Sequence, residues 1–304
     1  MNASALAGLA VMVSSEAATL AGVEPFASWN TPIAWTGFIL FADGVVWRVR
    51  GSSWIRSSPR EFAFLAAVSI PLWLVFELYN LQIHNWFYAG LPENALLRGF
   101  GYAWSFATIW PAIFEGAELI GVCRSGGLLR SRDLPPPFTG HSGRREPRRT
   151  DLRHGLSGPA QIVSLVAGAA MLIWPLVWPS PYLAAPVWLG FILMLDPINA
   201  RLGGESLAGD LVEGRDARVK NLVLSGFLCG ILWEFWNYWA RAKWHYTVPI
   251  MENVKIFEMP VPGYLGFPAF ALECFTMYVF ARMVCASTVS GFKQAIGPGR
   301  PIAL

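Results

Sequence analysis

The sequence predicts an all-α integral membrane protein with about seven transmembrane helices, arranged as two parallel three-helix repeats joined by a fourth helix. Hydrophobic residues make up 54% of the 304-residue chain and charged residues 14%, whereas a soluble domain carries about 25% charged residues. The mean hydropathy is +0.42. Seven segments are apolar enough to cross a bilayer, and two stretches of the chain match each other at a nearly constant offset.

Each of the seven apolar segments is close to the length of roughly 20 residues that a membrane crossing needs. They cover residues 32–48, 62–82, 99–122, 158–178, 184–200, 219–240 and 262–286. Residues 1–31 hold a short Ala-rich run that Glu16 and Glu24 interrupt, so we expect an exposed or interfacial lead-in there. The N-terminus also lacks the basic segment of a secretory signal.

Basic residues gather in alternate loops. The loops after the first, third and fifth segments, with the C-terminal end, hold 19 of the 23 Lys and Arg residues; the remaining four are Arg98, Arg241, Lys243 and Lys255. Cytoplasmic loops are the basic ones, which predicts a plasma or inner membrane protein with its N-terminus outside and its C-terminus in the cytoplasm. Residues 123–157, rich in Pro, Gly and Arg, are expected to form a cytoplasmic linker, and residues 287–304 a cytoplasmic tail. No nucleic-acid-binding face is indicated.

The internal repeat covers residues 32–122 and 184–286, with residues 158–183 as the joining helix. AWTGFILFADGVVWR (34–48) matches VWLGFILMLDPINAR (187–201). Three pairs of acidic residues align at offsets of 153, 157 and 158: Asp43 with Asp196, Glu77 with Glu234, and Glu115 with Glu273. Because the joining helix restores the direction of the chain, both units are expected to have the same orientation in the membrane.

Carboxyl groups inside the apolar segments are the candidate catalytic groups, because an ionisable residue there costs about 3 kcal/mol or more. Burial without a cation favours the protonated form, which suits general-acid chemistry. We expect the proton-handling residues to be Glu234, Glu273, Glu77 and Glu115, with Glu234 working alongside Glu273. Asn237 and Asn80 each lie three residues after a glutamate, on the same helix face, and are expected to orient these carboxyl groups. Polar contacts between helices, worth perhaps 1 kcal/mol each, are the structural alternative.

Aromatic residues follow each Glu-x-x-Asn pattern. Trp244, Tyr246, Trp86 and Tyr88, with His245 between the first two, are the candidate substrate-binding residues. They fit either an aromatic belt at the membrane surface or a pocket whose ring faces stabilise a carbocation. No His, Cys or carboxylate spacing indicates a metal site, and no cofactor is expected.

The second repeat presents these motifs in a characteristic order: Leu195-Asp196 with Arg201, Trp233-Glu234, Trp244-His245-Tyr246, and Pro268 with Glu273. This order resembles the two-subunit and fused lycopene cyclases, membrane carotenoid cyclases with duplicated three-helix units. That family has Trp-Asp where this chain has Trp-Glu, and paired glutamates where it has one. The resemblance implies an enzyme that acts on an apolar, isoprenoid-like or carotenoid-like lipid by non-redox acid–base chemistry of the isomerase or lyase type.

Two other function classes stay open. Parallel repeats with carboxyl groups within the membrane are also typical of a proton-coupled transporter. A non-catalytic membrane scaffold would use the same carboxyl groups for packing alone.

Overall fold

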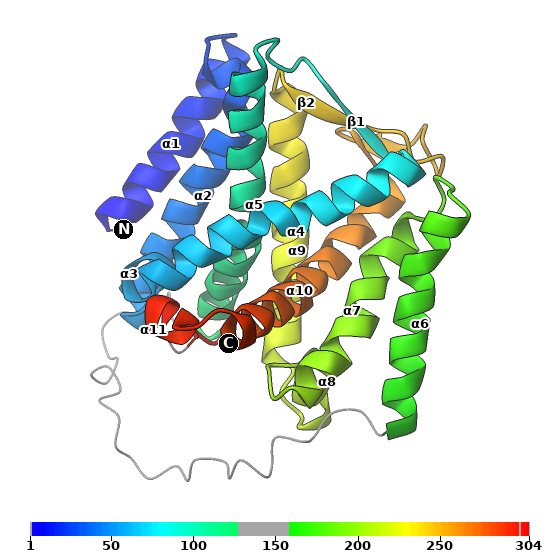
Figure 1. Cartoon of the computed structure of the whole chain (residues 1–304). Helices are drawn as coiled ribbons and strands as arrows, with labels where there is room; N and C mark the ends of the chain where they lie inside the picture. Colours follow the sequence, from blue (N-terminus) through cyan, green and yellow to red (C-terminus); the bar gives the residue numbers. More distant parts are fainter. Residues whose placement is uncertain (1, 127–157, 298, 304) are drawn as a thin grey trace.

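The computed structural model describes residues 2–126, 158–297 and 299–303. Residues 127–157, most of the expected basic linker, lie outside the described part. Eight long helices account for most of the described chain (Figure 1): α1 (Ala3–Leu20), α2 (Phe26–Arg50), α4 (Pro59–Ile83), α5 (Ala95–Arg124), α6 (Gly158–Val177), α7 (Ala184–Arg201), α9 (Ala217–Trp239) and α10 (Gly266–Thr288).

Short elements connect the long helices. Three are short α-helices and one is a 3-10 helix: α3 (Trp54–Ser57), α8 (Leu207–Val212), α11 (Phe292–Ile296) and η1 (Val261–Leu265). Two antiparallel ribbons each have two strands: β1 (Trp86–Ala89) with β2 (Lys243–Tyr246), and β3 (Lys255–Ile256) with β4 (Met259–Pro260).

The predicted fold class is confirmed. Within the described residues, seven helical segments are long and apolar enough to cross a membrane: α1, α2, α4, α5, α6, α9 and η1 with α10. The set differs from the predicted one at two helices. The segment expected at 184–200 forms α7, but Asp196, Asn199 and Arg201 make its last turns polar. The added candidate is α1, in the region expected to be a lead-in.

Helix α1 packs along α2 through small residues. A Cβ atom on Gly8 would lie 2.4 Å from the carbonyl oxygen of Gly37, so the two backbones touch in the way that small residues permit between membrane helices. Glu16, which interrupts the apolar run, accepts a hydrogen bond from the side chain of Asn30 at 3.0 Å. Residues 3–20, within the expected exposed or interfacial lead-in, thus form a helix that packs on α2 and is long and apolar enough to cross a membrane.

The two helices run antiparallel, so the chain starts near the end of α2. The side chain of Asn2 donates to the carbonyl oxygen of Gly44 at 2.8 Å, and Arg56 donates to Ser4 at 2.5 Å. Asn2 thus lies at the end of the bundle that carries the basic turn after α2. The predicted external N-terminus rests on residues 1–31 not crossing the membrane, whereas α1 is itself long and apolar enough to cross one.

The aligned aspartates Asp43 and Asp196 hold equivalent positions in the two repeats. Asp43 accepts a hydrogen bond from the backbone N–H of Ile55, in the first turn of α3, at 2.9 Å. Asp196 accepts from the N–H groups of Leu207 and Ala208, in the first turn of α8, at 2.7 and 2.9 Å. Each carboxylate satisfies helix N-terminal donors that have no partner within their own helix. Both aspartates therefore fix the loop that follows their helix.

A network of ion pairs closes this end of the bundle. Arg282 binds Glu61 and Glu205, each at 2.9 Å, and Arg218 binds Glu205 at 2.6 Å and also Asp210. The last described residues enter the network: the N–H of Arg300 donates to Glu61 at 2.6 Å. Ile302 and Ala303 are fully buried. The end of the expected tail is thus packed against the helices.

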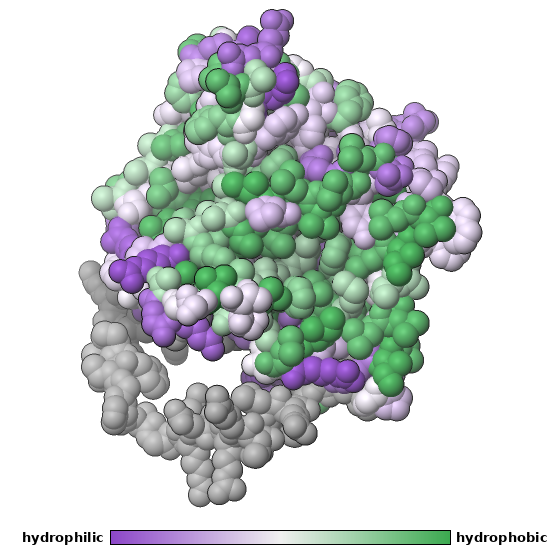
Figure 2. All heavy atoms as spheres, viewed as in Figure 1, coloured by the Kyte–Doolittle hydropathy of each residue, from purple (hydrophilic) through white to green (hydrophobic). Residues whose placement is uncertain are grey.

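The exposed surface is largely apolar between the two ends of the molecule. Figure 2 shows hydrophobic residues over most of the visible face, α6 included, with hydrophilic residues gathered toward the ends. On α6 the exposed apolar side chains are Ile162, Val163, Val166, Ile173, Trp174, Leu176 and Val177. An apolar surface of this extent is matched by the acyl chains of membrane lipids, as expected for a multi-pass membrane protein.

Candidate functional site

A cavity of about 550 Å³ lies at the end of the bundle where β1 pairs with β2. Seven tryptophans, four tyrosines and three phenylalanines line it, and no Asp or Glu is among its lining residues. Its size falls within the roughly 300–1,000 Å³ of small-molecule sites, and an apolar wall with a few polar groups is typical of them.

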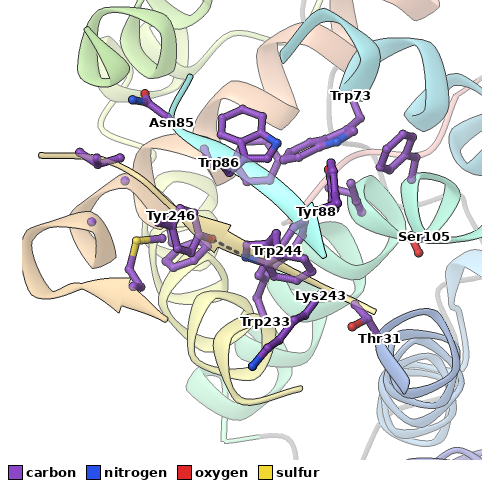
Figure 3. A pocket seen from close by; sticks show the side chains of 18 of the residues that line it. Thr31, Trp73, Asn85, Trp86, Tyr88, Ser105, Trp233, Lys243, Trp244 and Tyr246 are labelled. Atoms are coloured by element: carbon purple, nitrogen blue, oxygen red, sulfur yellow. Dashed lines mark hydrogen bonds between the residues drawn. The ribbon is translucent and has the colours of Figure 1, made fainter. Parts of the chain in front are cut away.

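One wall of the cavity is the β1–β2 ribbon. The register places Trp86 opposite Tyr246 and Tyr88 opposite Trp244. Because side chains alternate between the faces of a strand, all four rings share one face, and all four line the cavity (Figure 3). The two sequence motifs, 157 or 158 residues apart, therefore meet in a single site rather than forming two. These four candidate substrate-binding residues are brought together as pocket residues.

His245 lies on the other face of the ribbon. Its ring is 5.4 Å from that of Phe87, and its Nδ1 is 3.0 Å from an oxygen of Glu258. Lys243 binds the second oxygen of Glu258 at 3.1 Å. Burial by itself would raise the pKa of Glu258, but the hydrogen bonds from His245 and Lys243 lower it below the ordinary value. His245 therefore does not line the cavity with the other four candidates, because strand alternation turns it away.

Asn80 and Asn237 attach the ribbon to the helices. The Asn80 side chain donates to the carbonyl oxygen of Trp86 at 2.8 Å and accepts from its N–H at 3.1 Å. Asn237 makes the same pair of bonds to Trp244, both at 2.9 Å. Each amide thus mimics a neighbouring strand, and within the described chain neither bonds to a carboxyl group. The predicted role of orienting the glutamates is replaced by one of positioning the tryptophan backbones.

Glu77 and Glu234 lie directly behind the tyrosines of the ribbon. The Tyr88 hydroxyl donates to Glu77 at 2.5 Å, and the Tyr246 hydroxyl donates to Glu234 at 2.8 Å. Glu77 also accepts from the indole N–H of Trp73 at 2.8 Å. Glu234 is fully buried, and its second oxygen has no hydrogen-bond partner among the described residues. Neither carboxyl group lines the cavity; each bonds to a tyrosine that does.

The hydroxyl groups of the two tyrosines keep their protons at neutral pH. Burial, followed by the negative charge of Glu234, raises the pKa of Tyr246; burial, followed by the charge of Glu77, raises the pKa of Tyr88. Trp244 donates its indole N–H to the Tyr246 oxygen at 2.9 Å, completing a chain of donors from Trp244 through Tyr246 to Glu234. The indole N–H only holds the phenol oxygen in place, so a proton can pass between the Tyr246 hydroxyl and the Glu234 carboxyl group.

The structure does not bring Glu234 and Glu273 together. A Cβ atom on Gly230 of α9 would lie 2.3 Å from the ring of Phe267 of α10, so these two positions are level with each other. At 1.5 Å per residue, Glu234 is about 6 Å nearer the cavity and Glu273 about 9 Å farther from it. Both oxygens of Glu273 lack a hydrogen-bond partner within the described residues. The predicted working pair is therefore separated along the bundle.

Glu115 lies in a similar position in the first repeat. It is fully buried in α5, six residues beyond Ile109 of the cavity wall, and neither of its oxygens has a partner in the part of the chain that the structure describes. Neither Glu115 nor Glu273 lines the cavity. The four predicted catalytic glutamates thus divide into two behind the cavity wall and two deeper in the bundle.

Several lining residues escaped the sequence analysis. Trp73 is four residues before Glu77, so helical spacing already places it on the same face. Thr31 and Trp35 of α2, with Arg98 and Ser105 of α5, also line the cavity. No local motif distinguishes these four, because their approach to the ribbon depends on the packing of distant helices.

Comparison of the chain with protein-family models, with curated proteins and with solved structures finds no match. The resemblance to lycopene cyclases rests on the order of the motifs.

Proposed function

We propose that this protein is an integral membrane enzyme that binds an apolar, isoprenoid-like or carotenoid-like lipid in the aromatic cavity and acts on it by non-redox acid–base chemistry. The observation that carries the proposal is the pair of Tyr–Glu hydrogen bonds at the wall of this cavity. Tyr246 with Glu234 and Tyr88 with Glu77 place two proton-transfer pairs beside one apolar site.

The cavity is suited to a carbon skeleton that passes through a cationic intermediate. Indole and phenol faces stabilise a positive charge without reacting with it, and their rigid rings bury a large apolar area. One pair would deliver a proton to a carbon–carbon double bond, and the other would remove a proton from a carbon next to the resulting cation. One proton enters and one leaves, so the product is an isomer of the substrate and no redox cofactor is needed.

We infer the membrane orientation from the basic end of the bundle. The positive-inside rule puts the ion-pair network in the cytoplasm, in a plasma or inner membrane, together with Asn2 and residues 299–303. The mouth of the cavity then lies in the outer leaflet. Asn2 bonds to Gly44 near the end of α2, and Arg300 bonds to Ser52 just beyond it. Both ends of the described chain therefore fall on the cytoplasmic side, which requires α7 to cross as an eighth helix, in place of the external N-terminus expected from the sequence.

The test is conversion of a carotenoid precursor in a host that accumulates lycopene. Tyr246→Phe and Glu234→Gln are expected to lower product formation at least tenfold, in line with the loss of a general acid–base group. His245→Gln is the matched control, since it changes the same strand on the face turned away from the cavity. Protein amount and monodispersity in detergent are measured for each variant. Equal product from wild type and Glu234→Gln would refute the catalytic assignment.

A proton-coupled transporter is the second candidate, and one observation favours it. Glu115 and Glu273 are buried between the cavity and the ion-pair network without hydrogen-bond partners among the described residues, where carboxyl groups of a proton path would be found. Proton uptake into proteoliposomes that depends on an added lipid and is lost in Glu273→Gln would support this reading. A protein that converts lipid but moves no protons would exclude it.

A further inference from the structure

The two Tyr–Glu pairs differ in where their indole donors point. In the first repeat, both indoles reach the carboxyl group: the N–H groups of Trp73 and Trp86 donate to Oε1 of Glu77 at 2.8 and 3.4 Å. The Tyr88 hydroxyl donates to the same oxygen at 2.5 Å, and Glu77 is partly exposed. An oxygen that accepts three hydrogen bonds belongs to an ionised carboxylate, because each donor stabilises its negative charge.

In the second repeat, the indole donor goes to the phenol instead. Trp244 donates its N–H to the hydroxyl oxygen of Tyr246 at 2.9 Å (Figure 3), and Tyr246 donates to Oε1 of Glu234 at 2.8 Å. Glu234 is fully buried, and its Oε2 has no partner among the described residues. A buried carboxyl group with one neutral donor is more stable with its proton than without it.

Two carboxyl groups in such unequal surroundings divide the work of acid–base catalysis. The group that keeps its proton serves as the acid, and the group that stays ionised serves as the base. A weak base is enough here, because a C–H bond next to a carbocation is strongly acidic. The acid is assisted by Trp244, since its N–H stabilises the charge that develops on the Tyr246 oxygen as that oxygen gives up its hydrogen.

We infer that the pair of Tyr246 with Glu234 is the acid that protonates the substrate and that the pair of Tyr88 with Glu77 is the base that removes a proton from the cation. This inference rests on the proposed function and gives its proton transfer a direction.

Each step conserves atoms and electrons. In the acid step, the Tyr246 hydroxyl turns to the substrate, gives its hydrogen to one carbon of a double bond and takes the proton of Glu234. The other carbon becomes a cation, and Glu234 becomes a carboxylate. In the base step, the Tyr88 oxygen takes a proton from a carbon next to the cation and passes its own hydrogen to Glu77. The electron pair of the broken C–H bond forms the new double bond. Glu77 then holds the proton that Glu234 lost, and the return of that proton resets the site.

Trp73 and Trp244 are the positioning residues of this scheme. Trp73 acts on the base by donating to its carboxylate, and Trp244 acts on the acid by donating to its phenol. Trp73 therefore affects only the removal of a proton from the cation, whereas Trp244 affects the formation of the cation.

The test follows deuterium from D2O into lycopene. Membranes that contain the full-length protein are incubated with lycopene, and both the product and the recovered lycopene are analysed by mass spectrometry. Glu77→Gln removes the base but keeps the acid, so the cation forms and returns a proton to Tyr246. Product should fall at least tenfold, while the recovered lycopene gains deuterium. Glu234→Gln removes the acid, so product and deuterium uptake should both fall at least tenfold.

Indole variants that keep an aromatic ring separate positioning from packing. Trp73→Phe should raise the ratio of deuterium in recovered lycopene to product roughly threefold or more, as the loss of one hydrogen bond to a charged group allows. Trp244→Phe should lower product and deuterium uptake together, with the amount of lycopene bound per protein unchanged. Trp188→Phe is the control, because its indole lines the same cavity but donates to neither pair within the described residues; it should keep the wild-type ratio.

The outcomes separate this inference from the proposed function. Deuterium uptake in Glu234→Gln but not in Glu77→Gln reverses the roles and overturns the inference, as does equal uptake in both variants. An unchanged ratio in Trp73→Phe, or a loss of bound lycopene that accounts for the effect of Trp244→Phe, overturns the positioning roles. All these results leave conversion by wild type in place. A wild-type protein that neither converts nor labels lycopene contradicts the proposed function, and the inference with it.

Discussion

Tyr246 donates its hydroxyl hydrogen to Glu234 across 2.8 Å, and this is the one hydrogen bond that the Glu234 carboxyl group receives within the described residues. The equivalent carboxyl group, Glu77, receives bonds from Tyr88 and from Trp73, and is partly exposed. The two repeats thus share an arrangement but differ in how fully each carboxyl group is satisfied.

This difference predicts unequal effects on stability. Tyr246→Phe leaves a fully buried carboxyl group without a donor and should lower the free energy of unfolding by about 1–3 kcal/mol. Tyr88→Phe should cost less, because Trp73 still donates to Glu77. Thermal unfolding in detergent compares the two. A larger loss for Tyr88→Phe would contradict the pairing described here.

The asparagine contacts predict a structural effect in place of a purely catalytic one. Asn237→Ala removes two hydrogen bonds to Trp244 and should destabilise the protein by about 1–3 kcal/mol, and Asn80→Ala should act in the same direction. The measurement is again the midpoint of thermal unfolding. If both variants unfold as wild type and lose only lipid conversion, the asparagines orient catalytic groups as first expected from the sequence.

The ion-pair network predicts a contrast between two cations of one helix. Arg218→Met should lower the free energy of unfolding by about 3 kcal/mol, because it removes a buried cation from the network. Glu205 still pairs with Arg282, and Asp210 still pairs with Arg215, which limits the loss. Lys220→Met removes an exposed pair with Asp216 and should change the free energy of unfolding far less, because exposed ion pairs contribute little to stability. Denaturant titration gives both values, and equal losses would argue against a buried network.

The cluster around Glu258 predicts a dependence on pH. Its pKa is lowered in the folded protein, so its stabilising contribution is fully present above the unfolded value of about 4.3 and is lost as the pH falls through the folded value. The difference in melting temperature between wild type and Glu258→Gln should therefore be constant from neutral pH down to about pH 5 and shrink below about pH 4. If the difference in melting temperature disappears between pH 5 and 8, the effect belongs to another titratable group and the prediction fails.

The sequence predicted the class of fold because long apolar segments and sparse charge are local properties. It located the glutamates, tryptophans and tyrosines of the ribbon because each motif occurs twice. It could not predict their partners. Pairing of Trp86 with Tyr246 joins strands from separate repeats, and nothing in either segment specifies that contact.

The errors have physical causes that can be named. His245 was grouped with its neighbours by sequence proximity, although residues 244 and 246 of a strand face away from 245. Helix α1 was missed because Glu16 interrupts its apolar run, and nothing in the sequence shows that Asn30 of α2 donates a hydrogen bond to that carboxyl group. We expected Glu234 to work with Glu273 because both belong to the second repeat. In the structure, α9 and α10 run antiparallel, which places the two carboxyl groups at different depths in the bundle.

The central claim is that the aromatic cavity holds a lipid, and two glycines of α5 provide a direct test. A side chain at Gly101, which lines the cavity, or at Gly99, which does not, would meet no atom within 4 Å. Gly101→Trp should fill the cavity, whereas Gly99→Trp adds the same side chain outside it. The measurement is the amount of lipid that co-purifies per protein, determined by mass spectrometry and, for a polyene, by absorption. We predict that wild type and Gly99→Trp retain a bound lipid and that Gly101→Trp loses it; equal lipid content in all three would contradict the claim.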